Sequence, residues 1–209
     1  MIDTTTAMTY IAIVLGFVFI PGPATLLTIA RAMSSGTRAG IATGAGIAAG
    51  DVVHSLMAIL GISAIIAASA ILFSIIKYMG AAYLVYLGLK ALLSKTPPRL
   101  TASPALPINA RQAFRQAITA ELLNPKTAIF FLAFLPQFLR PENGSATLQL
   151  TILGLLFVLL GFLSTVVYAL SAGIIGNFLR RNPAVLKWQG KVVGGIYCAL
   201  GARLALQDR

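Results

Sequence analysis

The sequence predicts an all-α integral membrane protein with six transmembrane helices in two inverted three-helix repeats. Three observations support this fold class. The 209-residue chain is 58% hydrophobic and only 10% charged, whereas globular proteins have about 25% charged residues. Six hydrophobic stretches are long enough to cross a bilayer, and two of them contain proline motifs near their middle. We therefore expect the first and fourth transmembrane helices to be broken.

Each predicted span meets the requirement of roughly 20 apolar residues for crossing the hydrocarbon layer. The first stretch is expected to be retained, because residues 1–8 lack the Lys and Arg of a signal-peptide n-region. The six predicted spans are about 8–30, 39–64, 71–93, 113–139, 148–172 and 184–206.

A proline-rich segment from Ser94 to Gln112 divides the chain. Prolines among Ser, Thr and basic residues are typical of a loop rather than a helix. We predict one membrane domain over residues 1–209, with repeat one at about 8–93, a cytoplasmic loop at about 94–112 and repeat two at about 113–206. The run from Lys77 to Tyr83 (KYMGAAY) is echoed at Lys191–Tyr197 (KVVGGIY). This echo, with matching proline motifs in each half, favours an inverted repeat.

The net charge of +11 follows the loops rather than a soluble basic face. Eleven of the 16 basic residues fall on one side of the predicted topology, and cytoplasmic loops of membrane proteins are enriched in Lys and Arg. We therefore expect both termini to lie outside the cytoplasm and expect no nucleic-acid partner. The eleven are Arg31, Arg38, Lys90, Lys95, Arg99, Arg111, Arg115, Arg180, Arg181, Lys187 and Lys191.

The two proline motifs predict a binding site near the middle of the membrane. Proline removes a backbone donor and breaks a helix, and a broken backbone is tolerated at that depth only in protein or beside a polar cavity. A pair of such breaks in matching positions is typical of secondary transporters. The motif residues are Pro21, Gly22 and Pro23, and Asn124, Pro125 and Lys126.

Four residues of the predicted spans bear most on chemistry: two of the five acids, the lone histidine and a lysine near the middle of the fourth span, where a charge costs about 2.5–3.5 kcal/mol. They are Asp51, His54, Glu121 and Lys126. With the motif residues, they form the predicted substrate and proton pathway. Asn124 can cap a half-helix that starts at Pro125, and helix N-termini favour a carboxylate. Asp51 or Glu121 could hold an ammonium, so the set suits a zwitterionic amino acid.

Structural alternatives remain open for these residues. Asp51 or Glu121 could simply pair with Lys126, and His54 could either relay protons or donate one structural hydrogen bond. Glycines at intervals of four in the second span favour helix packing or dimerisation over ligand contact. Ser164, Tyr168 and Ser171 form a hydroxyl stripe that could line the pathway or bond to backbone.

The sequence resembles the lysine exporter and homoserine/threonine exporter (LysE/RhtB-type) family over nearly its full length. The resemblance rests on the first proline motif, the Gly-Asp51-Val-Val-His54 segment, the Lys77–Gly88 run and Leu123–Phe138 with its Asn-Pro-Lys motif. It implies a bacterial inner-membrane exporter of amino acids or close derivatives, driven by the proton gradient. It also implies roles for Asp51, His54 and both motifs, while the exported solute, the stoichiometry and the oligomeric state stay open.

Two other function classes fit the residues less well. A metal-cation exporter or channel would need several thiolate, imidazole or carboxylate ligands together, and the chain has one cysteine and one histidine. An intramembrane enzyme would need a nucleophile with a base, or a metal motif such as His-Glu-x-x-His. We therefore expect a transporter rather than an enzyme, with no cofactor and no bound metal, working on an amino acid and protons in a lipid bilayer.

Overall fold

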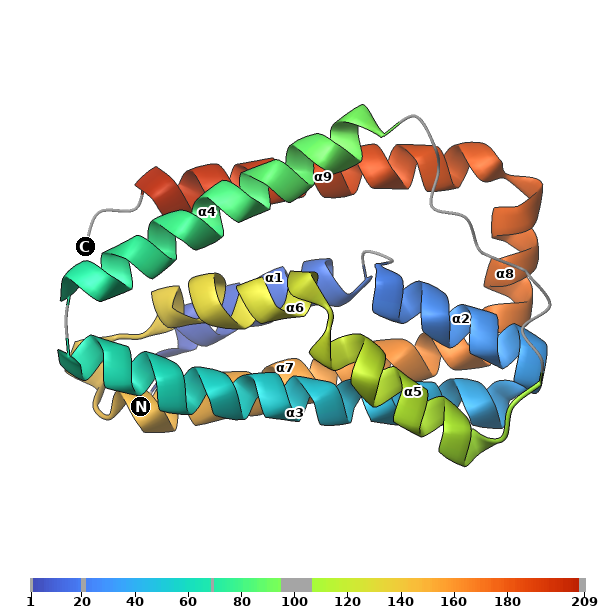
Figure 1. Cartoon of the computed structure of the whole chain (residues 1–209), viewed down its shortest axis with the longest axis horizontal. Helices are drawn as coiled ribbons and strands as arrows, with labels where there is room; N and C mark the ends of the chain where they lie inside the picture. Colours follow the sequence, from blue (N-terminus) through green and yellow to red (C-terminus); the bar gives the residue numbers. More distant parts are fainter. Residues whose placement is uncertain (1, 20–21, 69, 95–106, 207–209) are drawn as a thin grey trace.

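The computed structural model describes residues 2–19, 22–68, 70–94 and 107–206, and the regular elements in these ranges are all helical (Figure 1). The α-helices are α1 (Thr4–Phe19), α2 (Pro23–Ser35), α3 (Thr37–Ala68), α4 (Ala70–Leu93), α5 (Ala110–Leu122), α6 (Pro125–Ile129), α7 (Ala146–Leu170), α8 (Ala172–Arg181) and α9 (Pro183–Leu206). A π-helix, η1 (Phe130–Phe134), and two 3₁₀ turns, η2 (Leu135–Phe138) and η3 (Pro141–Asn143), follow α6.

Among the described residues, α3 and α7 are long and apolar enough to cross a membrane. Two bent helix pairs give two more candidate spans if each pair is counted as one span. Helices α1 and α2 meet at 51°, and α5 meets the α6–η2 segment at 48°. Both bends occur where the sequence predicts broken helices, because proline stands at the first turn of α2 and of α6. The count of six spans stays a prediction.

The chain runs back and forth along the long axis of the molecule (Figure 1). Both termini lie at one end, which we call the terminal end. Helix α1 starts there, whereas α5 starts at the opposite end, so the two halves of the chain begin in opposite directions. The inverted three-helix repeat itself stays a prediction.

Glycines on α3 allow three neighbouring helices to approach it closely. A Cβ atom added to Gly46 would meet the carbonyl oxygen of Phe114 in α5, and one added to Gly50 would lie 2.7 Å from the Cβ of Glu121. Gly40 and Gly44 make similar approaches to α2 and α7. The predicted packing role of these glycines is therefore met within the chain.

Helices α4 and α9 pack along each other at a second set of glycines. A Cβ on Gly88 would lie 2.7 Å from the Gly194 carbonyl oxygen, and a Cβ on Gly194 would lie 2.7 Å from that of Gly88. Small residues that bring backbones together are a common device of membrane helix pairs. These two helices form the layer at the top of Figure 1.

Three predicted boundaries are wrong. The loop does not extend to Gln112, because Asn109 and Gln112 form a capping box that starts α5 at Ala110; residues 95–106 lie outside the described ranges. The fourth span does not remain α-helical to residue 139. It passes into η1 and then into η2, which contains Pro136, a residue that lacks the donor for a regular turn. Residues 172–181, predicted to be mostly loop, form α8.

Candidate functional site

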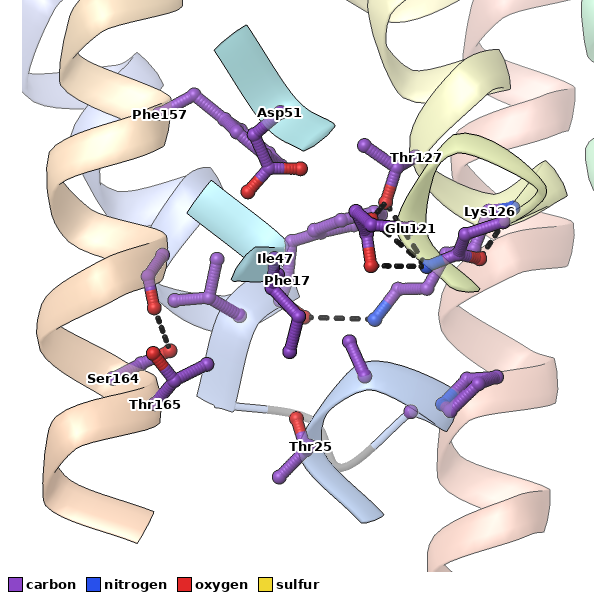
Figure 2. A pocket seen from close by; sticks show the side chains of 16 residues that line it. Phe17, Thr25, Ile47, Asp51, Glu121, Lys126, Thr127, Phe157, Ser164 and Thr165 are labelled. Atoms are coloured by element: carbon purple, nitrogen blue, oxygen red, sulfur yellow. Dashed lines mark hydrogen bonds between the residues drawn. The ribbon is translucent and has the colours of Figure 1, made fainter. Parts of the chain in front are cut away.

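A cavity lies where the two bent helices meet α3 and α7 (Figure 2). Its volume is about 40 Å³, enough for a few waters at roughly 10–15 Å³ each. Six of the nine predicted site residues line it: Gly22, Pro23, Asp51, Glu121, Asn124 and Lys126. We call this the central cavity.

The three other predicted residues do not line the central cavity. His54 is buried beside it and stacks on the ring of Phe131, with centroids 6.1 Å apart. Pro125 is exposed and serves as the first residue of α6. Pro21 lies outside the described residues.

Glu121 is held by a buried hydrogen-bond network at the junction of α5 and α6. The Asn124 side-chain amide donates to both carboxylate oxygens at 3.0 and 3.2 Å, and the Thr127 hydroxyl donates to Oε1. The Asn124 side-chain oxygen accepts from the Lys126 backbone N–H at 3.1 Å, which caps α6 as the sequence predicts. One asparagine thus fixes both the carboxylate and the start of the half-helix.

Lys126 extends from α6 to the broken end of α1. Its ammonium donates to the carbonyl of Phe17 at 3.1 Å and lies 4.0 Å from the centre of the Phe17 ring (Figure 2). Gly22 leaves room for it, since a Cβ there would lie 3.2 Å from the ammonium nitrogen. A carbonyl and an aromatic face together bind an alkylammonium well.

The Phe17 carbonyl is one of three that lose their i+4 backbone donor to the prolines of the motifs. A proline at position i has no N–H to give the carbonyl at i−4, so Pro21 frees Phe17 and Pro23 frees Phe19. The second of these carbonyls accepts from the Tyr168 hydroxyl of α7 at 2.8 Å. An intramembrane backbone acceptor without a partner costs several kcal/mol, so both contacts stabilise the break.

The third proline is Pro125, which removes the i+4 donor of the Glu121 carbonyl. The Asn124 backbone N–H donates to this carbonyl instead, at 2.9 Å. His54 Nε2 lies 3.0 Å from that oxygen. A carbonyl can only accept, so Nε2 carries the hydrogen and donates it. This contact gives His54 the structural hydrogen bond that the sequence left as one of two alternatives.

Asp51 has the least satisfied polar group of the site. Its side chain is 2% exposed, and its Oδ1 has no hydrogen-bond partner among the described residues. The carboxyl group points toward the central cavity in Figure 2 and interacts with that of Glu121. A buried acceptor without a partner is costly, and its position beside a cavity is typical of a ligand contact.

The start of α2 also faces the central cavity. Its N-cap residue, Gly22, provides no side-chain hydrogen bond to the first turn, and Ala24 and Thr25 line the cavity. The N–H groups of a first turn have no intrahelical partner and favour a negative group. The start of α6, by contrast, is already capped by Asn124.

Several lining residues did not stand out in the sequence. Thr127 lies six positions from Glu121, a spacing that no regular helix brings together, and the break at Pro125 makes the contact. Phe17, Ile47 and Phe157 give the cavity an apolar wall. Ser164, which the sequence did single out as part of a hydroxyl stripe, both lines the cavity and donates to the Gly161 carbonyl at 2.8 Å. Among the described residues, no group of three or more His, Cys, Asp or Glu side chains is placed to hold a metal ion.

The chain is similar to several bacterial membrane proteins. An uncharacterised membrane protein of Pseudomonas aeruginosa is 30% identical over 201 residues, which cover 94% of this chain and 93% of that one. A leucine efflux protein of Salmonella typhimurium is 26% identical over 197 residues, covering 94% and 93% of the two chains. One of Klebsiella pneumoniae is 27% identical over 201 residues, covering 95% of each. No solved structure matches the chain.

The family comparison covers both breaks and every residue that lines the central cavity. The family described as LysE type translocator matches residues 15–208, and the apolar helices agree with a protein that crosses the membrane several times. The chain belongs to the LysE type translocator family.

Proposed function

We propose that this protein is a secondary transporter that exports amino acids or close derivatives across the bacterial inner membrane. The observation that carries the proposal is the buried Asp51 Oδ1 atom, which lacks a partner and lies beside the cavity between two broken helices. A cationic group of a substrate would supply the missing partner. Transport rather than catalysis is also what the family description implies.

The cavity offers a complementary group for each part of an amino acid. The ammonium would bind Asp51, and the carboxylate would bind the free N–H groups at the start of α2. An apolar side chain would lie against Phe17, Ile47 and Phe157. Leucine is the first substrate to test, because relatives that match over most of the chain are named leucine efflux proteins.

Proton coupling follows from the charges around the cavity. Two carboxyl groups, Asp51 and Glu121, face one ammonium, Lys126, so the fully ionised set has a net negative charge in a buried site. Desolvation makes such an excess charge costly. Either a proton or a cationic substrate removes it, so the two would compete for the same carboxyl pair. Exchange of one for the other would couple export to the proton gradient.

Binding requires a change in the cavity. A volume of about 40 Å³ holds a few waters but not leucine. The two bends provide the joints at which half-helices can move, and motion of the two halves about the central cavity would give alternating access. In this proposal both termini lie outside the cytoplasm, and the oligomeric state is left open.

Efflux from vesicles tests the proposal. Purified protein would be reconstituted into liposomes loaded with a panel of labelled amino acids, and initial efflux would be measured with and without a proton gradient. We expect saturable efflux of one class, apolar amino acids first, that is faster when protons can enter in exchange. Protein-free liposomes give the leak.

Folded, inserted protein that moves no amino acid would refute the proposal. The panel would then be repeated with metal cations, the solutes of the leading alternative.

A further inference from the structure

A second cavity lies at the terminal end of the molecule. Its volume is about 160 Å³, and it is lined by Thr5 and Thr9 of α1, Phe134 and Phe138 of η1 and η2, Arg140, and Arg203 of α9. We call it the terminal cavity. It shares no lining residue with the central cavity, and it is the larger of the two.

A continuous line of aromatic rings separates the two cavities. Phe138 of the terminal cavity contacts Phe134 with centroids 5.2 Å apart, and Phe134 contacts Phe130 at the same spacing. Phe130 in turn contacts Phe17 and Phe157, which line the central cavity, at 4.7 and 4.6 Å. A solute that moves from one cavity to the other along α1 must displace these rings.

The backbone that holds the rings is irregular at this point. Phe130 and Phe134 begin and end the π-helix η1, and Phe138 ends the 3₁₀ turn η2. Such segments inside helices are frequent at functional sites and have weaker hydrogen bonding than α-helix. The same two elements, α1 and the α6–η2 segment, therefore border both cavities and the rings between them.

The terminal cavity carries a charge that suits an anion. Arg140 and Arg203 contribute two guanidinium groups, and the threonine side chains add hydroxyls. The acid Asp3 interacts with Arg140, and its pKa is lowered mainly by hydrogen bonds from Thr6 and slightly by Arg140. Asp3 is therefore ionised and offsets part of the Arg140 charge, which leaves Arg203 as the stronger anion-binding group.

We infer that the terminal cavity is a second substrate site, in which Arg203 and Arg140 bind the carboxylate of the transported amino acid on the terminal side of the aromatic rings. Guanidinium groups bind carboxylates in a two-pronged geometry. The inference rests on the proposed function and adds a binding step at one end of the pathway. Arg203 is a binding residue for that end alone.

The test compares the two sides of the membrane. Right-side-out and inside-out vesicles would be prepared from the same expressing cells, so that the terminal end faces the medium in only one of them. The concentration of external leucine that gives half-maximal exchange would be measured for the wild type and for Arg203→Gln. We expect an increase of about tenfold in the vesicles with the terminal end outside, because a charge-assisted contact is lost. We expect no change in the other vesicles.

Four controls define the result. Arg38→Gln removes an exposed positive charge from the start of α3, at the opposite end of the molecule from the terminal cavity, and should change neither value. Arg203→Lys keeps the charge and should recover part of the lost affinity. Arg140→Gln should act in the same direction as Arg203→Gln but more weakly, because Asp3 already offsets it. Leucinol, the analogue of leucine that has no carboxylate, should inhibit leucine exchange with the same inhibition constant in the wild type and in Arg203→Gln.

Two outcomes would overturn the inference. If Arg203→Gln left the half-saturating concentration on the terminal side unchanged, with exchange otherwise intact, the terminal cavity would not be a substrate site. The proposal of a transporter would still stand. A shift of equal size in both vesicle types that varies with the anionic lipid content would assign Arg203 to a lipid phosphate. Absence of leucine exchange by the wild type would instead count against transport itself.

Discussion

At the scale of single residues, Asp51 is distinguished by a buried carboxyl oxygen, Oδ1, that has no hydrogen-bond partner among the described residues. Asparagine has nearly the same shape but carries no charge and binds no proton at neutral pH. If Asp51 holds the substrate ammonium and the coupling proton in turn, Asp51→Asn should lower gradient-driven efflux at least tenfold. The remaining flux should not depend on the proton gradient.

Initial efflux rates at several imposed pH differences would check this. Glu142→Gln is the control, since Glu142 is an exposed acid that lines neither cavity. An Asp51→Asn protein whose efflux still rises with the gradient would place the proton elsewhere, with Glu121 the next residue to test.

His54 gives a second prediction at the residue scale. Its two possible roles, hydrogen-bond donor and proton relay, require different properties of the side chain. As a donor to the Glu121 carbonyl, it needs an N–H but no titration. Gln can donate from a similar position, whereas Leu cannot. His54→Gln should therefore keep the pH dependence of efflux, while His54→Leu should lower the free energy of unfolding by about 1–3 kcal/mol. Thermal unfolding in detergent, together with efflux at pH 6 to 8, separates the roles.

A proton relay through His54 would give the opposite pattern. His54→Gln would then abolish gradient dependence while thermal unfolding stayed unchanged.

The residues of the central cavity differ in how readily the sequence indicates them. Asp51, Glu121 and Lys126 are predictable, because charge within a hydrophobic span needs a reason. The prolines even indicate which carbonyls lose a partner, since each acts on the residue four positions earlier. What the sequence does not indicate is the partner, because Tyr168 is 149 positions from Phe19 and Lys126 is 109 from Phe17. Such pairs depend on how helices cross, which no local pattern records.

At the scale of elements, the crossing of α3 and α5 depends on glycine. A Cβ at Gly46 would meet the Phe114 backbone oxygen, an atom that cannot rotate away. Gly46→Ala should therefore separate the helices and destabilise the protein by about 1–3 kcal/mol. Gly61 lies on the same helix with nothing within 4 Å of its Cβ position, so Gly61→Ala should be neutral or slightly stabilising.

Unfolding temperatures of the two variants in the same detergent would be compared with the wild type. If Gly46→Ala were as stable as Gly61→Ala, the close approach of α3 and α5 would not contribute to stability.

The sequence predicts where helices occur better than it predicts which type of helix forms. Each stretch of about 20 apolar residues corresponds to one helix or one bent pair, and proline at the first helical position marks the starts of α2 and α6. The π-helix is different, because its Phe-rich sequence would suit an α-helix equally well. Its geometry depends on Pro136 and on the packing of Phe130, Phe131 and Phe134 into the aromatic core.

At the scale of the whole molecule, the two broken helices are joined to each other. Lys126, from the motif of the second half, binds a carbonyl freed by the motif of the first half. Asp51 of the first half interacts with Glu121 of the second. A movement at one break therefore changes a contact at the other. Such reciprocal contacts are what coordinated opening and closing of two halves would require.

The placement of both termini at one end gives a prediction about orientation (Figure 1). Most basic residues, such as Arg31, Arg38 and Arg111, follow or precede helices at the opposite end. Because cytoplasmic loops are enriched in Lys and Arg, the terminal end should face away from the cytoplasm. In a Cys198→Ser background, a cysteine at Thr4 should react with a membrane-impermeant maleimide in intact cells. One at Thr37, at the opposite end, should react only after the cells are permeabilised.

Both positions are exposed, so accessibility depends on the side of the membrane rather than on burial. Efflux by each variant would verify its fold. Labelling of Thr37→Cys alone in intact cells would invert the topology and place the terminal cavity on the cytoplasmic side. In that case Arg203 would meet amino acids at entry rather than at release, and its substitution would change the half-saturating concentration for cytoplasmic substrate.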